Sequence, residues 1–373
     1  MKFSIDTGNL LQAAQIVSRA VASKTTIPAL TGIYLECTNK NTLLLKATDL
    51  EIGIEHTVEA NIEEIGSMVV PAKYLIDILR KLPNTEITLT TTPEDNNLTI
   101  NYNQSQLSLN TFPTEQFSFL PNISNTHTIT INNELFSNMI KKVSISFSHD
   151  ITRPVLNGAL FEVGDHKLTL VSSDTYRLSL IETGLDKDLE EDLKPIIIPA
   201  KALMELGRLI DKEESIKIII DNNQAQFEND SIKIRVRLID GKFPAYQNVI
   251  PNEYSTKIIA DTKELLLSIE RATVISSDEN FNKTCTIKLE VNDNIIHIRS
   301  YSPNIGQLND TLIADKEGED INISFNGNYL IDILKIIDTD KVIIELNGNL
   351  SPGIIKPYES NMNYLSLILP VRS

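Results

Sequence analysis

The chain holds few side chains in arrangements that could catalyse a reaction or bind a metal ion. Its five histidines stand singly, and no two have the i, i+4 spacing of a helical metal site. The sequence contains neither the glycine-rich loop that cradles phosphates nor the serine elbow of a hydrolase. Nothing in these patterns supports catalysis, and we expect no metal ion or other cofactor.

The cysteines and paired carboxylates are better explained by structure than by chemistry. Cys37 ends the alternating segment Ile33–Cys37, which is typical of a β-strand, so we expect a packed thiol and not a nucleophile. Two cysteines, Cys37 and Cys285, cannot make a disulfide framework or a four-thiolate metal site. Glu190 and Glu191 lie in a polar run, which is typical of a solvated loop.

Length and composition predict a globular protein of several domains. The chain has 373 residues, more than the roughly 250–300 at which one hydrophobic core stops growing. Hydrophobic residues make up 41% and charged residues 23%, which is ordinary for globular proteins. No stretch approaches the roughly 20 apolar residues of a membrane span, and the first residues lack the apolar core of a secretory signal. With only two cysteines, we expect a cytoplasmic location.

The strongest pattern is a segment that occurs three times. Each copy is a short apolar run, a helix-breaking residue and then apolar residues at helical spacing, which predicts a strand followed by an amphipathic helix. The copies cover residues 69–80, 197–208 and, more loosely, 324–335. Pro71 and Pro199 are typical of a helix start.

A second amphipathic helix opens each third of the chain, at 10–24, 134–148 and 262–277. Hairpin patterns follow each, and proline-containing segments after Phe112 and Phe243 mark two boundaries. Because two helices must bury their apolar faces on a sheet, each third predicts one α+β unit. We therefore expect three tandem copies of a two-helix plus antiparallel-sheet domain, at residues 1–122, 123–252 and 253–373.

Charge is divided unevenly between the predicted helices and the remainder. The chain has 34 Lys and Arg against 50 Asp and Glu, a net charge of −16. The six predicted helices, counted with Lys81, Asp211, Lys212 and Asp338 just after them, hold 13 basic and 8 acidic residues, a net of +5, which leaves −21 elsewhere. A positive helical face suits loose contact with phosphates. Ordinary solvated helix surfaces explain the same count, so charge alone leaves both interpretations open.

Several short motifs, in a fixed order along the whole chain, resemble one family. They are Met1–Ile5, Thr48–Glu51, Leu156–Gly158, Ser173–Leu178, Asp240–Pro244 and Leu369–Arg372. With the repeated Pro-Ala-Lys helices and the three tandem domains, they resemble the bacterial DNA polymerase III beta subunit, the replication sliding clamp. The resemblance implies the DNA-clamp fold and a ring of two head-to-tail subunits, with helices lining the hole.

The resemblance also implies the function and the partners. It implies a non-catalytic processivity factor that encircles duplex DNA and tethers the replicative polymerase. The expected partners are duplex DNA bound without sequence preference, the DNA polymerase III catalytic subunit, a clamp loader, other polymerases and repair proteins with short linear motifs, and a second copy of the chain. Phosphate contacts suit such a role because they carry no sequence information and are labile, which permits sliding.

Basic side chains are the expected DNA contacts. The resemblance implies Lys24, Lys73, His149 and Arg153, and the basic residues of the predicted helices add Arg80, Lys201 and Arg208.

The resemblance further implies a pocket between the second and third domains that binds partner peptides. Its expected residues are Leu156, Ser173, Thr175, Tyr176, Arg177, Leu178, Pro244, Val249, Tyr329, Leu350, Pro352, Ile368, Leu369, Pro370, Val371 and Arg372. The apolar run at 367–371 is costly in solvent, so we expect it to complete a groove. At Thr175–Tyr176, Asn248 and Leu369 the chain departs from the residues most common in the family.

An edge strand and a helix end are the expected dimer contacts. Residues 106–109 alternate as an edge strand does, and Leu107 and Leu109 are its apolar residues. Val274 and Ile275 match the opposing apolar contact that the resemblance implies, although packing within their own domain explains them equally well.

Two other classes of protein stay open on the residues alone. An acidic three-domain β-rich scaffold or adhesion protein that does not bind DNA would show the same repeats and hairpins, but it would not need basic helices. A hydrolase built on acidic pairs has no supporting motif.

Overall fold

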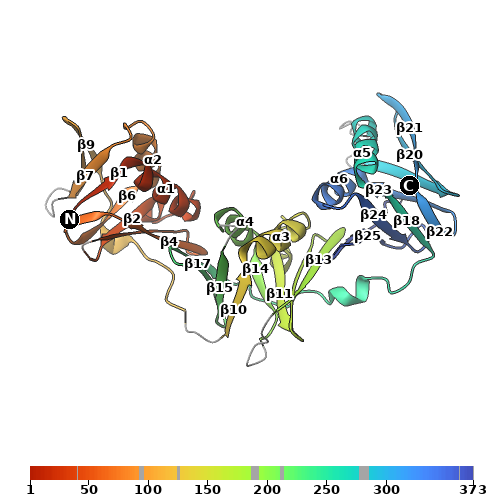
Figure 1. Cartoon of the computed structure of the whole chain (residues 1–373), viewed down its shortest axis with the longest axis horizontal. Helices are drawn as coiled ribbons and strands as arrows, with labels where there is room; N and C mark the ends of the chain where they lie inside the picture. Colours follow the sequence, from red (N-terminus) through yellow and green to blue (C-terminus); the bar gives the residue numbers. More distant parts are fainter. Residues whose placement is uncertain are drawn as a thin grey trace. The chain divides into compact units, whose positions relative to one another are not determined.

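The computed structural model of the chain describes residues 1–39, 41–91, 96–123, 127–185, 193–210, 214–276, 285–360 and 362–372. In these ranges the chain forms six α-helices and four antiparallel sheets (Figure 1). Backbone contacts divide it into two compact units. The first unit comprises residues 1–136 and 205–238, and the second comprises residues 137–204 and 239–373.

The first unit contains a five-stranded and an eight-stranded sheet. The five-stranded sheet has the order β5 (Asn61–Glu64), β1 (Lys2–Asp6), β7 (Glu86–Thr91), β8 (Asn97–Tyr102), β9 (Ser105–Asn110). The eight-stranded sheet has the order β10 (His127–Asn132), β15 (Ser215–Ile220), β16 (Gln224–Glu228), β17 (Ile232–Arg237), β4 (Ile52–Glu59), β3 (Thr42–Thr48), β2 (Gly32–Cys37), β6 (Gly66–Pro71). Helices α1 (Thr7–Val17) and α2 (Ala72–Leu79) pack against each other in this unit.

The second unit contains a nine-stranded and a four-stranded sheet. The nine-stranded sheet has the order β14 (Ile196–Pro199), β11 (Gly158–Gly164), β12 (Lys167–Ser173), β13 (Arg177–Gly184), β26 (Asn363–Ile368), β25 (Gly353–Pro357), β24 (Lys341–Leu346), β18 (Thr256–Asp261), β22 (Asp315–Gly318). The four-stranded sheet has the order β21 (Gly306–Ile313), β20 (Ile295–Ser302), β19 (Thr286–Asn292), β23 (Ile321–Asn326). Helices α5 (Thr262–Ser276) and α6 (Gly327–Ile336) pack together here.

The predicted threefold repetition of a two-helix α+β domain is confirmed. The first third carries α1 and α2, the second carries α3 (Asn133–Ser144) and α4 (Ala200–Leu209), and the last carries α5 and α6. In each third, one strand precedes the first helix, and further strands follow both the first and the second helix. The same order of elements therefore occurs three times along the chain.

Each large sheet is built from two successive thirds, which the sequence patterns did not indicate. Strand β4 of the first third pairs with β17 of the second, with Ile54 opposite Ile234. Strand β13 of the second third pairs with β26 of the last, with Leu180 opposite Leu365. In both junctions, a strand from the first half of one domain joins the final strand of the next domain.

Helices α3 and α5 begin within one residue of the predicted start, whereas α1 begins three residues earlier, and α1 and α3 both end before the predicted residue. Asp6, Asn132 and Asp261 cap the first helix of each third by accepting backbone N–H bonds of 2.8–3.2 Å. Helix α1 ends at Val17 and continues only as one 3₁₀ turn, η1 (Ser18–Ala20), and the polar residues 23–26 that follow are all exposed. Lys24 therefore lies in a loop and not in a helix.

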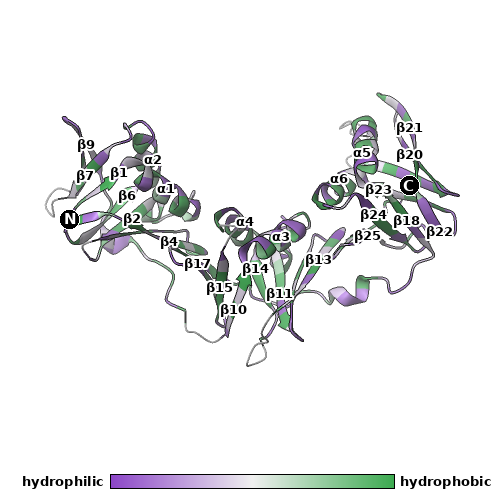
Figure 2. Cartoon of the chain, viewed as in Figure 1, coloured by the Kyte–Doolittle hydropathy of each residue, from purple (hydrophilic) through white to green (hydrophobic). Residues whose placement is uncertain are grey.

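Alternate residues of the strands and one side of each helix form the cores. The fully buried phenylalanines are Phe3, Phe136, Phe161, Phe227 and Phe325. Figure 2 shows hydrophobic and hydrophilic residues mixed along α5 and α6, as expected for helices with one buried side. No helix in the described ranges is long and apolar enough to cross a membrane.

Candidate functional sites

A cavity of about 570 Å³ lies in the second unit, beside the junction of β13 and β26. Its lining includes half of the residues that we expected in a peptide pocket: Leu156, Ser173, Thr175, Arg177, Leu178, Pro244, Val249 and Leu369. These residues come from four segments that are far apart in the sequence. The fold of the second unit therefore brings them together around one space.

The floor of this cavity is also part of the hydrophobic core. Leu156, Leu178 and Leu367 are only 3–4% exposed and belong to one buried cluster. The cluster includes Phe243 and Tyr246, which also line the cavity. Core packing and pocket lining are thus two functions of the same leucines, because one side of each side chain faces the cavity.

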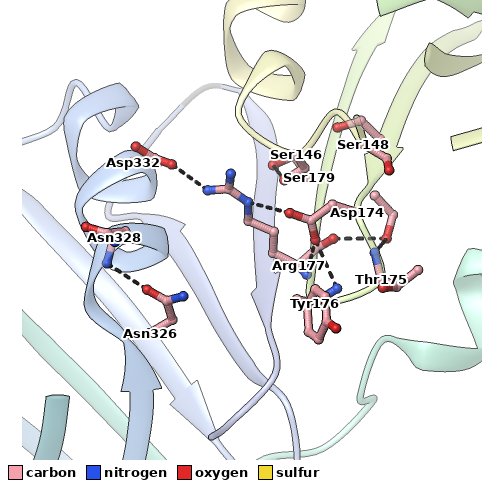
Figure 3. A network of polar contacts seen from close by, with 12 residues as sticks. Ser146, Ser148, Asp174, Thr175, Tyr176, Arg177, Ser179, Asn326, Asn328 and Asp332 are labelled. Carbon is pink, nitrogen blue, oxygen red and sulfur yellow. Dashed lines mark hydrogen bonds and ion pairs between the residues drawn. The ribbon is translucent and has the colours of Figure 1, made fainter. Parts of the chain in front are cut away.

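The segment from Ser173 to Arg177 is a tight turn held by its own side chains (Figure 3). The Asp174 carboxylate accepts the backbone N–H groups of Tyr176 and Arg177, both at 2.9 Å. The Ser173 hydroxyl donates to the Arg177 carbonyl at 2.9 Å, and Thr175 has a φ of 78°. The turn places Thr175 and Arg177 in the cavity wall, whereas Tyr176 is 60% exposed and does not line it.

The Arg177 side chain contacts three other side chains, and Figure 3 shows two of them, Asp174 and Asp332. Its Nε donates to Asp174 at 3.0 Å, and its Nη1 donates to Asp332 on α6 at 2.6 Å. The guanidinium carbon lies 4.3 Å from the centroid of the Tyr329 ring. Tyr329 does not line the cavity, but it contacts Arg177, which does. The wall is rigid here because side chains from the second and last thirds hold one another.

Tyr246 is a second polar group in the wall. Its hydroxyl donates to the Glu162 carboxylate at 2.9 Å. Burial and this bond to a carboxylate raise the pKa of Tyr246 above its ordinary value. The phenol is therefore neutral at neutral pH.

The C-terminal segment contributes Leu367 and Leu369 to the cavity lining, and of the expected residues 368–372 only Leu369 lines it. Strand β26 ends at Ile368, and the N–H of Leu369 donates to the Tyr176 carbonyl at 2.8 Å. The N–H of Val371 donates to the Ser324 carbonyl at 2.8 Å, so the tail is tied to β23. Leu369 lines the cavity and is 38% exposed, whereas Pro370 and Val371 do not line it.

Eight expected pocket residues lie outside the cavity lining: Tyr176, Tyr329, Leu350, Pro352, Ile368, Pro370, Val371 and Arg372. Ile368 is fully buried and Leu350 is 71% exposed. Pro352 lines a separate cavity of about 120 Å³ between residues 251–254 and strand β24. The sequence offered no signal that separates these residues from the lining set.

Eight lining residues are not among those expected for the pocket: Thr152, Arg153, Pro154, Val155, Phe243, Ala245, Tyr246 and Leu367. All of them lie within four residues of an expected one, so extending each motif by a few positions would have found them. Arg153, which we expected on the DNA-facing surface, is exposed and lies in the wall of this cavity.

The other expected DNA contacts lie at accessible positions. Lys24 and His149 lie in loops, Lys73 lies on α2 and Arg80 caps its end, and Lys201 and Arg208 lie on α4. Arg80 is 3.6 Å from Asp77, and Arg208 is 2.7 Å from Glu205.

The positive charge of the helices is smaller than the sequence count gave. Within the observed helix bounds there are eight basic and six acidic residues, a net of +2. Arg19, Lys24, Arg80 and Lys81 lie beyond helix ends, while Asp211 and Lys212 fall outside the described residues. Lys142 is 1% exposed, donates to the Ile336 carbonyl and contacts Asp338, so it adds no surface charge.

The expected dimer residues lie on exposed features of the two units. Strand β9 is at the end of its sheet, and its Leu107 and Leu109 are half-buried. A cavity of about 690 Å³ beside it is lined by Leu107, Ile78, Leu82 and the basic residues Arg80 and Lys81, among others. Val274, in the second unit, is 67% exposed, whereas Ile275 is half-buried.

The remaining candidates for chemistry are buried or undescribed. Cys37 and Cys285 are buried, and burial raises the pKa of the Cys37 thiol to about 11, so it is protonated at neutral pH. Glu190 and Glu191 lie outside the described residues.

Comparisons with known proteins agree over the whole chain. Models of the N-terminal, central and C-terminal domains of the DNA polymerase III beta subunit match residues 1–121, 130–245 and 247–372. The beta sliding clamp of Staphylococcus aureus is 32% identical over the full length of both chains, and that of Staphylococcus epidermidis is 31% identical. The crystal structure of the DNA polymerase sliding clamp from Bacillus subtilis matches with a TM-score of 0.95 at 30% identity, covering 100% of this chain and 99% of that one.

A further clamp structure, the DNA polymerase III beta chain of Streptococcus pneumoniae, matches with a TM-score of 0.94 at 30% identity over the whole of both chains. The fold is therefore that of a DNA clamp with three tandem domains. The chain belongs to the DNA polymerase III beta subunit family, the beta sliding clamps. Members of this family act in DNA replication as non-catalytic processivity factors.

Proposed function

We propose that this chain closes head to tail with a second copy into a ring around duplex DNA, where it tethers the replicative polymerase. A clamp loader places the ring on DNA, and other polymerases and repair proteins bind through short linear motifs. For the ring, we propose three domains at residues 1–122, 123–252 and 253–373. Family membership removes the basis for the alternative of an acidic scaffold or adhesion protein.

Two strand edges that pair with no other strand in the described part of the chain are the observation that carries the proposal. Within the chain, β4 pairs with β17 and β13 pairs with β26, always between one third and the next. The strand that corresponds to β4 and β13 in the last third is β21, and the strand that corresponds to β17 and β26 in the first third is β9. Both lie at the ends of their sheets. A second copy that pairs its β9 with β21 repeats the junction, and two such contacts close a ring.

The side chains near these edges suit that contact. Val274 on α5 is exposed, and the groove beside β9 is lined by Ile78, Leu82 and Leu107. Burying apolar groups of this kind is the main source of affinity in a stable interface. Leu109 and Ile275 complete the two apolar surfaces.

The cavity beside β13 and β26 is the proposed site for partner peptides. Its lining is mostly apolar, and its polar groups include those of Arg153, Arg177 and Tyr246. A cavity of about 570 Å³ is large enough for two or three side chains of a short motif. Affinity for one such peptide should be on the order of micromolar, about −8 kcal/mol.

Retention on closed DNA tests the ring. The protein is loaded with a bacterial clamp loader and ATP on nicked circular plasmid, and bound and free protein are separated by gel filtration. We expect retention on the nicked circle and loss after the plasmid is linearised, because a ring slides off an end. Equal retention on circular and linear DNA would contradict encirclement.

A further inference from the structure

One carboxylate in the first unit holds two arginines from different thirds of the chain. Arg19, in the 3₁₀ turn η1 after α1, donates from Nη1 to Glu205 Oε2 at 2.9 Å. Arg208, one turn further along α4 than Glu205, donates from Nη1 to Glu205 Oε1 at 2.7 Å. Each oxygen of the Glu205 carboxylate therefore accepts a hydrogen bond from one guanidinium. We call Glu205 the anchor of the two arginines.

The anchor is shielded and the arginines are open to solvent. The Glu205 side chain is 14% exposed, whereas those of Arg19 and Arg208 are 39% and 53% exposed. Each guanidinium has five N–H donors in a planar fork, and the described residues account for one donor nitrogen in each. The group carries a net charge of +1 and leaves most of its donors available to a ligand.

We propose that Arg19 and Arg208 form a two-arginine clamp for a backbone phosphate of duplex DNA, and that Glu205 is its positioning residue. The inference rests on the proposed passage of DNA along the helices. Forked guanidinium groups match the geometry of phosphate oxygens, and prior orientation reduces the side-chain entropy lost on binding. A surface arginine without such an anchor loses more side-chain conformational entropy when it binds the phosphate.

The direction in which one substitution changes the affinity for DNA distinguishes this positioning role from an effect of charge alone. Glu205→Gln removes a negative charge beside the arginines, so Coulomb attraction alone predicts tighter DNA binding. Loss of the anchor predicts the reverse, because both arginines become free to move. We expect the Glu205→Gln variant to bind DNA about threefold more weakly than the unchanged protein. We also expect the slope of log K against log [salt] to become less steep, by up to about 0.9 for each phosphate that the arginines no longer neutralise.

Fluorescence anisotropy with a short labelled duplex at several NaCl concentrations measures both quantities. The matched control is Glu134→Gln on α3, which makes the same charge change at an exposed residue far along the sequence from either arginine. We expect that control to bind DNA as well as or better than the unchanged protein. Tighter or unchanged binding by Glu205→Gln would overturn the proposed clamp.

A double-substitution cycle and a lysine variant keep the test independent of folding. With Arg19 and Arg208 both changed to Ala, Glu205→Gln should no longer weaken binding. Arg208→Lys keeps the charge but loses the fork, so it should weaken binding without shifting the melting temperature; full affinity in this variant would count against the clamp. If the unchanged protein is not retained on nicked circular plasmid, that result contradicts the proposed ring around DNA, on which the two-arginine clamp also rests.

Discussion

Leu156 and Leu178 each have two structural roles in the second unit. They are buried in the core of the second unit, and they also line the cavity that we propose for partner peptides. Substituting either would therefore change stability and binding together. Leu369 lines the same cavity but is 38% exposed, so its substitution should change peptide binding with less effect on stability.

We expect Leu369→Ala to weaken peptide binding about tenfold, or about 1.4 kcal/mol, because the truncated side chain no longer contacts an apolar anchor of the peptide. The melting temperature should change little. The measurement is fluorescence anisotropy with a labelled peptide from the tail of a replicative polymerase.

Val371→Ala is the matched control for that experiment. It removes apolar atoms two residues further along the tail, at a residue that does not line the cavity. It should bind the peptide as the unchanged protein does. If Val371→Ala weakens binding as much as Leu369→Ala, the peptide site extends along the tail and not into the cavity.

Strand β21 and helix α5 illustrate how single contacts fix an edge element. Asp310 on β21 accepts hydrogen bonds from Arg271 and, at 2.7 Å, from Ser268, both on α5. The hydrogen bond from Arg271, followed by that from Ser268, lowers the pKa of Asp310 below its ordinary 3.8. The ionised carboxylate therefore ties the edge strand to the helix that carries Val274.

The lowered pKa gives a pH dependence of known sign. A carboxyl group whose pKa is lower in the folded state stabilises that state above its unfolded pKa, and the stabilisation is lost as the pH falls through the folded value. We expect Asp310→Asn to be less stable than the unchanged protein by a constant amount above about pH 5, and this difference to shrink below about pH 4.

Denaturant unfolding at a series of pH values measures that difference. Asp315→Asn on β22, an exposed carboxylate, provides a comparison in the same unit. A stability difference for Asp310→Asn that stays unchanged into acid would show that the ionised form is not what holds β21 to α5.

At the scale of the whole molecule, ring closure depends on two edges that belong to the first and last thirds of the sequence. We expect Leu109→Asp to be monomeric by light scattering, because a charge in the apolar surface of β9 would be buried without a partner in the dimer. Its melting should remain cooperative, since Leu109 is on an edge strand and only half-buried.

Ser108→Asp controls for the added charge. Ser108 is the neighbouring residue on β9 and is exposed on the opposite face of the strand. It should leave the dimer intact. A stable Leu109→Asp dimer would indicate that the two copies meet through another surface.

The sequence by itself determined the features that have a local period or a local motif. Apolar spacing predicted six helices and the threefold repeat, and alternation at 106–109 predicted the edge strand β9. Motifs carried by neighbouring residues indicated the family, and the comparisons confirm it. Each of these signals is contained in a short stretch of chain, so it can be recognised without knowledge of the fold.

Only the tertiary structure decided how distant segments meet. The sharing of sheets between thirds, the cavity set that includes Val155 and Tyr246 but omits Val371, and the contact of Arg19 with Glu205 all join segments that no local period relates. Strand pairing fixes these neighbours through backbone hydrogen bonds that any residue except proline can make. The side chains therefore carry little record of which strand lies beside which, so local patterns did not give the complete set of residues at the sites built at those junctions.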